Sequence, residues 1–153
     1  MHSFFKVITF SFFFYSCSII DKLVDDNPFI VFQRTACYGT CPQYTVSIYH
    51  DGTINYHGLM FVDSIGCFSH KIPITKVNQL KDLLYEINFF DLDSVYLAPM
   101  TDVPSVITQV NLCNKNHKVV DEFKAPLEIK KIYHLIDSIC DSIIDWETCS
   151  VLQ

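Results

Sequence analysis

The sequence of 153 residues lacks three features, each of which would assign it to a large class of proteins. It has no run of lysine or arginine and a formal net charge of −6, so it has no basic patch of the kind that binds nucleic acid. Its apolar runs are all shorter than the ~20 residues that span a bilayer core. It contains no GxSxG, HExxH or phosphate-loop motif. The sequence therefore predicts no nucleic-acid partner and no cofactor, and it favours a non-catalytic protein without deciding the point.

The N-terminus has the pattern of a secretory signal peptide. Lys6 supplies a positive charge, residues 7–15 are apolar, and Ser16 precedes Cys17. Residues 14–17 (FYSC) resemble a bacterial lipobox, whose cysteine is diacylated and becomes the mature N-terminus. The alternative is an ordinary signal peptide or an uncleaved N-terminal anchor. We favour a lipid on Cys17, which would attach the protein to a membrane of the bacterial cell envelope, on the periplasmic or outer face of the outer membrane.

This leader divides the chain into four parts. We predict a lipoprotein-type signal peptide over residues 1–17 and a tether over residues 18–28. A single domain follows over residues 29–146, and residues 147–153 form a tail. Half of the residues are hydrophobic, which is enough for a packed core.

Seven cysteines are many for a chain of this size, and in an exported protein they indicate disulfides. Cys37 and Cys41 lie in the segment CYGTCPQY, and three interpretations stay open. A disulfide that closes a tight turn is the one we favour. The pair could also be a reactive dithiol, or a metal site completed by a histidine such as His50, His57 or His70. The other cysteines have no paired spacing and are expected to be buried free thiols: Cys67, Cys113, Cys140 and Cys149.

The residue pattern predicts an α+β domain. Alternating apolar residues indicate strands near residues 29–34, 44–49, 53–62, 67–72, 105–113 and 117–123. Helical spacing indicates one helix that Thr75 caps and that ends near Asn88, and another that begins at Pro126. We expect an antiparallel sheet of about five to six strands, in the order βββ(β)-α-ββ-α, with two helices on one face.

The first hairpin allows a prediction of register. A three-residue loop over residues 50–52 would pair Ile48 with Ile54 and Val46 with Tyr56, which keeps the apolar side chains on one face. Gly52 would then adopt a left-handed conformation. For the second hairpin, around residues 114–116, the sequence leaves the register ambiguous.

Three segments carry a resemblance to a known family. Residues 34–44 (RTACYGTCPQY), the pair Asp51-Gly52 and residues 56–58 (YHG) resemble the signature of an uncharacterised bacterial family, the domain of unknown function 6438. Looser matches are residues 89–90, 101–104, 125–127 and 136–137, so that the resemblance covers about residues 34–144. It implies an exported protein, often a lipoprotein, and brings no activity with it.

Arg34, Tyr38 and Asp102 are the candidate ligand-binding or structural residues. Arg34 could hold a carboxylate, with Asp102 as a possible partner, or it could bind an anionic ligand. Asp102 belongs to a long loop, where function tends to concentrate. Six aromatic residues either form a binding platform for a sugar or peptide or pack in the core: Tyr38, Tyr44, Tyr49, Tyr56, Phe61 and Phe68.

Our hypothesis is a lipid-anchored, non-catalytic binding or structural module. An envelope protein or a small ligand would dock near Arg34, Tyr38 and Asp102. The alternative is an envelope thiol-redox or metal-handling protein that uses Cys37 and Cys41.

Overall fold

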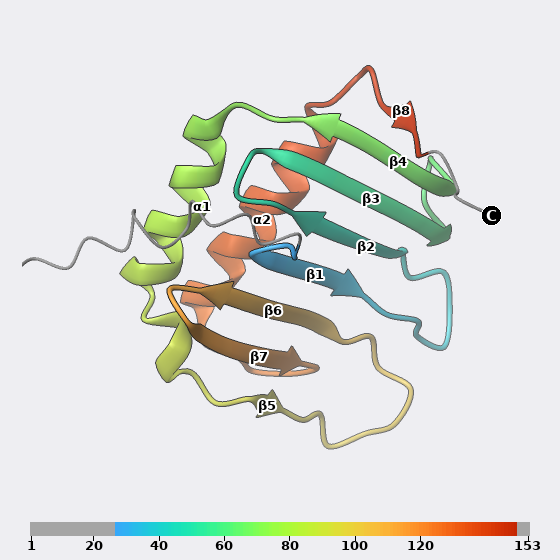
Figure 1. Cartoon of the computed structure of the whole chain (residues 1–153). Coiled ribbons are helices and arrows are strands. Elements are labelled where there is room, and N and C mark those ends of the chain that lie inside the picture. The colour runs from blue at the N-terminus through green and yellow to red at the C-terminus, as the bar shows by residue number, and fades with distance from the viewer. Residues whose placement is uncertain (1–26, 150–153) are drawn as a thin grey trace, which may run out of the picture.

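The computed structural model of the chain describes residues 27–149. Within this range the chain forms one eight-stranded sheet with the order β5-β7-β6-β1-β2-β3-β4-β8 (Figure 1). Every neighbouring pair is antiparallel except β5 and β7, which are parallel. The strands are β1 (Ile30–Arg34), β2 (Gln43–Ile48), β3 (Thr53–Met60), β4 (Gly66–Lys71), β5 (Val95–Tyr96), β6 (Val106–Leu112), β7 (Lys115–Asp121) and β8 (Glu147–Thr148).

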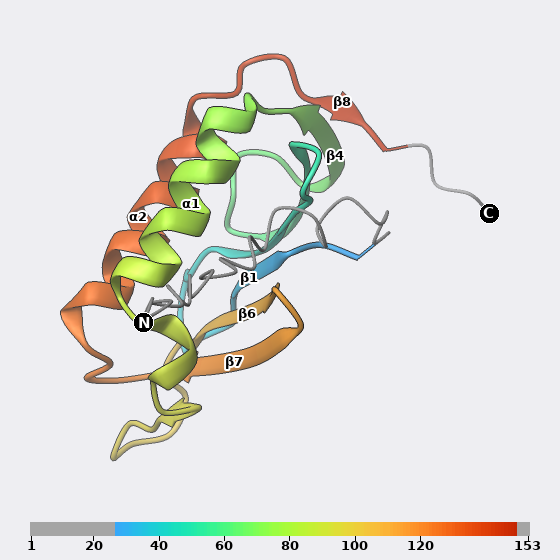
Figure 2. The same ribbon diagram turned by 60° about the vertical axis from the view of Figure 1, so that its left-hand side comes forward.

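Two long helices, α1 (Ile74–Glu86) and α2 (Leu127–Asp141), cover one face of this sheet (Figure 2). A short 3-10 turn, η2 (Phe89–Asp91), follows α1. Each helix buries a stripe of apolar residues at a spacing of three or four, among them Leu80 and Leu84 of α1 and Ile132 and Ile136 of α2. None of the described helices is both long and apolar enough to cross a bilayer.

The core lies between this helical layer and the sheet. Alternate residues of the central strands are fully buried beneath the helices, including Phe32, Val46, Ile48 and Ile54. The residues between them, such as Gln33, Thr45 and Ser47, point to the opposite face and remain partly exposed. The α+β class and the two helices on one face are confirmed.

The sheet has more strands than the sequence predicted. The six expected strands are present, and β5 and β8 extend the sheet by one strand at each edge. Each of these edge strands has only two residues, which is too short to show a periodicity in the sequence. β8 also lies in the segment that we assigned to a tail, and it pairs with β4 through Phe68 and Ser69.

The predicted register of the first hairpin is confirmed. Val46 pairs with Tyr56 and Ile48 with Ile54. Gly52 has a φ of +87°, and a Cβ at this position would lie 2.5 Å from the carbonyl oxygen of Ile72. Only glycine therefore fits this turn without a shift of the backbone.

The second hairpin and the helix starts differ from our expectations. Leu112 pairs with Lys115, so the loop consists of Cys113 and Asn114 rather than residues 114–116. Both loop residues have positive φ angles, of 51° and 61°, which is the conformation of a type I′ turn. At α1, Pro73 takes the capping position that we gave to Thr75, and no side chain caps the helix.

A buried carboxylate anchors the first half of α2. Asp121 at the end of β7 is 3% exposed and forms an ion pair with Lys130. The hydroxyl of Tyr133 also donates a hydrogen bond of 3.3 Å to Asp121. A charge at this depth is tolerated because both of these partners come from the helix that covers it.

The cysteines outside the predicted pair are a further correction. Cys67 of β4 and Cys149 beyond β8 form a disulfide, and their Cα atoms are 5.3 Å apart. Of the four cysteines that we expected to be buried free thiols, only Cys140 has a free sulfur. Spacing in the sequence gave no sign of the new pair because 82 residues separate its members.

The two disulfides of the described domain should contribute unequally to stability. A crosslink constrains the unfolded chain more when it closes a longer loop, and the sequence separations are 82 and 4 residues. We expect Cys67→Ser with Cys149→Ser to lower the free energy of unfolding by about 4 kcal/mol, and Cys37→Ser with Cys41→Ser by about 2 kcal/mol. Urea unfolding of the oxidised proteins measures both values. Equal losses would contradict the assignment of the long-range pair.

Candidate functional site

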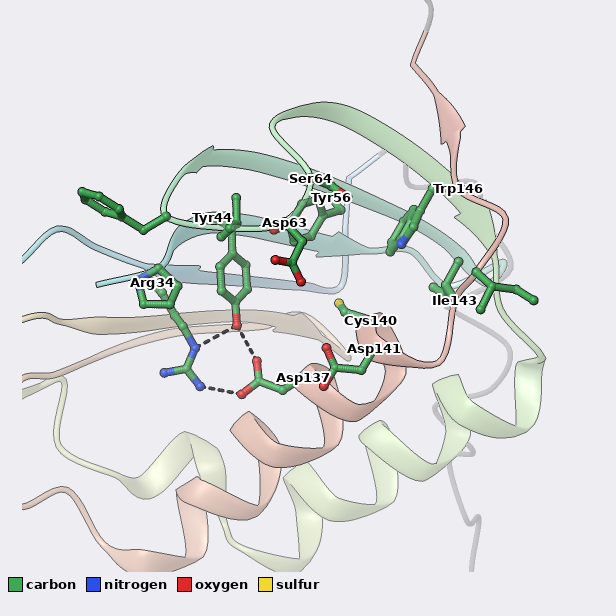
Figure 3. Close-up of a pocket in the computed structure, with 14 residues that line it drawn as sticks. Arg34, Tyr44, Tyr56, Asp63, Ser64, Asp137, Cys140, Asp141, Ile143 and Trp146 are labelled. Carbon is green, nitrogen blue, oxygen red and sulfur yellow. Dashed lines mark hydrogen bonds and ion pairs between the residues drawn. The ribbon is translucent and has the colours of Figure 1, made fainter. Parts of the chain in front are cut away.

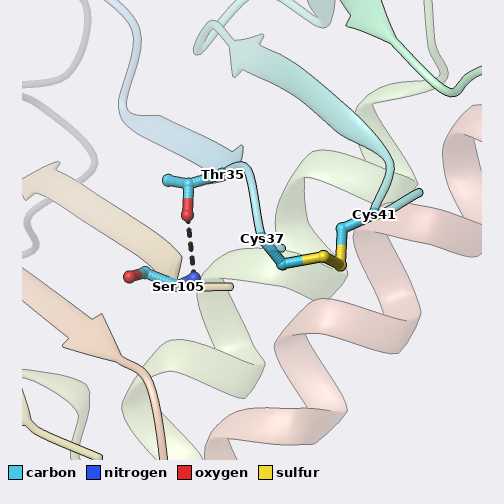
Figure 4. The surroundings of a disulfide bond; sticks show 4 residues. All are labelled: Thr35, Cys37, Cys41 and Ser105. Carbon is cyan, nitrogen blue, oxygen red and sulfur yellow. Dashed lines mark hydrogen bonds between the residues drawn. A yellow bond between two sulfur atoms is a disulfide. The ribbon is translucent and has the colours of Figure 1, made fainter. Parts of the chain in front are cut away.

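Four of the predicted site residues, Cys37, Tyr38, Cys41 and Asp102, lie at one end of the sheet, in two loops that contact each other. Cys37 and Cys41 form the disulfide that the sequence favoured, inside the loop that joins β1 and β2 (Figure 4). The loop that leads into β6 lies beside it: the backbone N–H of Ser105 donates a 2.8 Å hydrogen bond to Oγ1 of Thr35. The disulfide therefore braces a loop that is docked on its neighbour.

Tyr38 and Asp102 meet through their backbones. The N–H of Tyr38 donates a hydrogen bond of 3.2 Å to the carbonyl oxygen of Asp102. Tyr38 is 94% exposed, so its side chain extends into solvent. Asp102 is also exposed and has a φ of 61°.

Arg34 binds a different carboxylate from the one we suggested. Its Nη2 donates a hydrogen bond of 2.5 Å to Oδ2 of Asp137, on α2. Its Nε donates a hydrogen bond of 2.8 Å to the hydroxyl of Tyr44, and that hydroxyl donates one of 2.5 Å to Oδ1 of Asp137. Arg34, Tyr44 and Asp137 thus close a cycle of three hydrogen bonds, which we call the Arg-Tyr-Asp cycle.

The register of the strands explains why these three side chains meet. Arg34 and Tyr44 are direct partners across β1 and β2, so both side chains point to the face that the helices cover. Asp137 comes one helical turn after Tyr133, on the side of α2 that faces the sheet (Figure 3). Asp102, by contrast, lies in a loop beyond the end of the strands.

The cycle fixes the protonation states of Arg34 and Tyr44. Burial lowers the pKa of the Arg34 guanidinium, but the hydrogen bonds and charges of Asp137 and Tyr44 outweigh burial and raise it overall. Burial and the hydrogen bond to Asp137 raise the pKa of the Tyr44 hydroxyl above its ordinary range. Arg34 therefore stays charged and Tyr44 stays a donor at neutral pH.

A pocket of about 760 Å³ opens beside the cycle, between the sheet, the β3–β4 loop and the C-terminal end of α2 (Figure 3). Its volume is typical of small-molecule sites. The pocket is lined by Arg34, Pro42, Tyr44, Tyr56, Phe61, Val62, Asp63, Ser64, Asp137, Cys140, Asp141, Ile143, Ile144 and Trp146.

Three aromatic rings form one wall of this pocket. The ring centroids of Tyr44 and Tyr56 are 5.5 Å apart in a stacked arrangement, and those of Tyr56 and Trp146 are 5.6 Å apart. Trp146 directly precedes β8, so the pairing of β8 with β4 and the Cys67–Cys149 disulfide hold this side of the wall in place.

The thiol that faces the pocket is not a nucleophile at neutral pH. Burial, together with the negative charges of Asp137 and Asp141, raises the pKa of Cys140 to about 12. A thiol reacts as the thiolate, so Cys140 remains in its unreactive protonated form.

Several residues that line the pocket were missed by the analysis of the sequence. Asp137 carried a usable signal, because a carboxylate that neighbours the apolar stripe of a helix needs a partner. Asp63 and Trp146 carried no such signal. The β3–β4 loop brings Asp63 to the pocket, and the two-residue strand β8, which follows Trp146, brings Trp146 there. Of the six aromatic residues proposed as a platform, Tyr44, Tyr56 and Phe61 line the pocket.

The described part of the chain does not bring together the ligands of a metal site that would use Cys37 and Cys41. Both sulfurs of Cys37 and Cys41 are engaged with each other. Within residues 27–149, no group of three histidine, cysteine, aspartate or glutamate side chains lies close enough to hold a metal ion.

A comparison with protein-family models identifies the family of the chain. The model of a family described as "Domain of unknown function (DUF6438)" matches residues 28–140. The matched range contains the Arg-Tyr-Asp cycle and the Cys37–Cys41 loop, while Trp146 and β8 lie beyond it. No curated protein matches the chain.

The Arg-Tyr-Asp cycle should stabilise the domain. The side chains of Arg34 and Asp137 are 29% and 28% exposed, so loss of the charge in Asp137→Asn would leave Arg34 partly buried without a counter-charge. We expect the free energy of unfolding to fall by about 2 kcal/mol, as measured by urea denaturation. Asp141→Asn, one turn later and exposed, is the matched control and should change stability by less than about 0.5 kcal/mol. Similar losses in both variants would show that the cycle is not stabilising.

Proposed function

Because this chain belongs to the DUF6438 family, whose description carries no activity, we propose a function from its own residues: a non-catalytic binding module that a lipid on Cys17 holds in the bacterial cell envelope. The pocket beside the Arg-Tyr-Asp cycle is the binding site of this module.

The observation that carries the binding role is the preformed pocket. Its polar groups are already fixed by the cycle, in which each oxygen of Asp137 accepts one hydrogen bond. Its apolar surface comes from the stacked rings of Tyr44 and Tyr56 and from Trp146. Rigid apolar walls with a few oriented polar groups are typical of ligand sites, because little order is lost when the ligand enters.

The lining residues support binding over catalysis. They include no histidine, and a general base near neutral pH is most often a histidine. The pKa of the thiol of Cys140 is raised to about 12, which removes it as a nucleophile. Tyr44 and Asp137 are occupied by each other and by Arg34.

The sequence supports the membrane anchor. Cys17 and the other residues of the predicted signal peptide lie outside the described residues, as does most of the predicted tether. Eleven tether residues, 18–28, reach at most ~40 Å when fully extended. A lipid on Cys17 would therefore keep Phe29, the first residue of the domain, within this distance of the membrane surface.

A thiol-redox or metal-handling role for Cys37 and Cys41 is the second candidate. It is favoured by one observation, the presence of both cysteines as a disulfide in a surface loop. Reduction of that bond would open only a short loop, which is docked by hydrogen bonds that do not involve sulfur.

The anchor is tested by Cys17→Ala in cells. We expect the variant to leave the membrane fraction and to lose incorporation of labelled palmitate, since the acylated sulfur is then missing. Ser18→Ala serves as the control and should fractionate like the wild type. A Cys17→Ala protein that remains in the membrane fraction would refute lipid anchoring.

The binding role is tested by photo-cross-linking in cells with the full-length chain. Benzoylphenylalanine at position 61, on the pocket wall, should give a discrete adduct by intact-mass analysis or gel shift. The same residue at position 127 is the control, because Leu127 is 81% exposed and lies at the opposite end of α2. The adduct should persist in the Cys37→Ser, Cys41→Ser protein.

Two results would count against this proposal. Equal adducts at positions 61 and 127 would remove the evidence for a specific site. Loss of the adduct in the double cysteine variant, together with a readily titrated thiol pair in the wild type, would favour the redox role.

A further inference from the structure

The charges around the pocket are unbalanced. Three carboxylates line it, those of Asp63, Asp137 and Asp141, against the single cation Arg34. Asp137 neutralises Arg34 through the ion pair of 2.5 Å. Asp63 and Asp141 have no ion pair with any of residues 27–149, so two negative charges are left over.

These two carboxylates line the pocket from two different elements. Asp63 extends from the β3–β4 loop, and Asp141 ends α2; Figure 3 shows both side chains directed into the space between sheet and helix. Both residues are exposed to solvent. A ligand between them would meet a negative potential from two sides.

The aromatic wall adds a second, independent preference. Tyr56 and Trp146 both line the pocket, with ring centroids 5.6 Å apart. The face of an aromatic ring attracts a nearby cation, and tryptophan attracts it most strongly. The same wall offers apolar surface. An alkyl chain can pack against this surface, whereas an inorganic ion cannot.

We propose that this pocket binds an organic cation, an alkylammonium or guanidinium group whose charge lies between Asp63 and Asp141 and whose alkyl chain packs on Tyr56 and Trp146. This inference rests on the proposed binding role and names its ligand class. The group is carried either by a free amine or by a lysine or arginine side chain of a protein. It replaces the anionic ligand that Arg34 alone had suggested, because the charge of Arg34 is already balanced.

The raised pKa of Tyr56 agrees with a negative potential at the pocket. Burial raises the pKa of Tyr56 to about 12, and the charges of Asp63 and Asp141 add to this shift. Each carboxylate therefore acts on the aromatic wall, and the same electrostatic interaction that disfavours a phenolate there would favour a bound cation.

The chain contains a reporter for binding. Trp146 is its single tryptophan, so fluorescence excited at wavelengths that tyrosine does not absorb reads this wall of the pocket alone. The full-length protein in detergent is titrated with n-butylammonium, with the peptide Gly-Lys-Gly amide acetylated at its N-terminus, and with butyrate as an anion of similar size. We expect a saturable change with the two cations, weakened at ~0.5 M salt, and none with butyrate.

Charge neutralisation then locates the site. Asp63→Asn with Asp141→Asn should weaken cation binding about tenfold, since both leftover charges are removed. Glu147→Gln is the matched control, because Glu147 is exposed and adjacent to Trp146 in sequence but does not line the pocket; it should leave binding unchanged. Tighter binding of the peptide than of the amine assigns the ligand to a protein side chain, and the reverse assigns it to a free amine.

Three outcomes would overturn the inference: butyrate binding as tightly as n-butylammonium, Ca²⁺ binding in preference to both organic cations, or equal binding by the double variant and the control. None of them alters the cross-linking result at position 61. A specific adduct at position 61 with no response to cations would refute the ligand class and leave the binding role intact. Absence of the adduct would refute the binding role itself.

Discussion

The ion pair between Arg34 and Asp137 is the contact on which the position of α2, and so of the pocket, depends. Burial of apolar stripes attracts the helix to the sheet but does not fix its position along its own axis, because the hydrophobic effect is not directional. Two polar contacts supply that direction. Asp121 holds Lys130 and Tyr133 near the start of α2, and Arg34 holds Asp137 one turn beyond Tyr133. Sliding the helix would leave partly buried charges without partners.

Local patterns were sufficient to predict most of the fold. The alternation from Val46 to Ile48 and the glycine at position 52 determined the register of the first hairpin, and the spacing of apolar residues determined both helices. The second hairpin could not be solved in the same way, because its turn uses Cys113 and Asn114 in left-handed conformations and no glycine marks it. The two-residue edge strands contain too few residues for any periodicity to appear.

The site was harder to predict because its residues meet only through tertiary structure. Arg34 was a candidate either for holding a carboxylate or for binding an anionic ligand, and the suggested partner, Asp102, lies in a loop beyond the strand ends. The true partner is 103 positions away in sequence, and no local pattern links the two. Cys67 and Cys149 pose the same problem, since only the pairing of β8 with β4 reveals that they are neighbours.

The Cys67–Cys149 bond makes the aromatic wall depend on where the chain matures. In a reducing compartment Cys67 and Cys149 would remain unbonded thiols. The segment that contains Trp146 would then be held beyond Trp146 only by the short pairing of β8 with β4. Oxidation would fasten that segment to β4 and complete the wall. Under the proposed cation binding, a chain with reduced thiols would bind its ligand weakly, and affinity would develop only once this disulfide had formed.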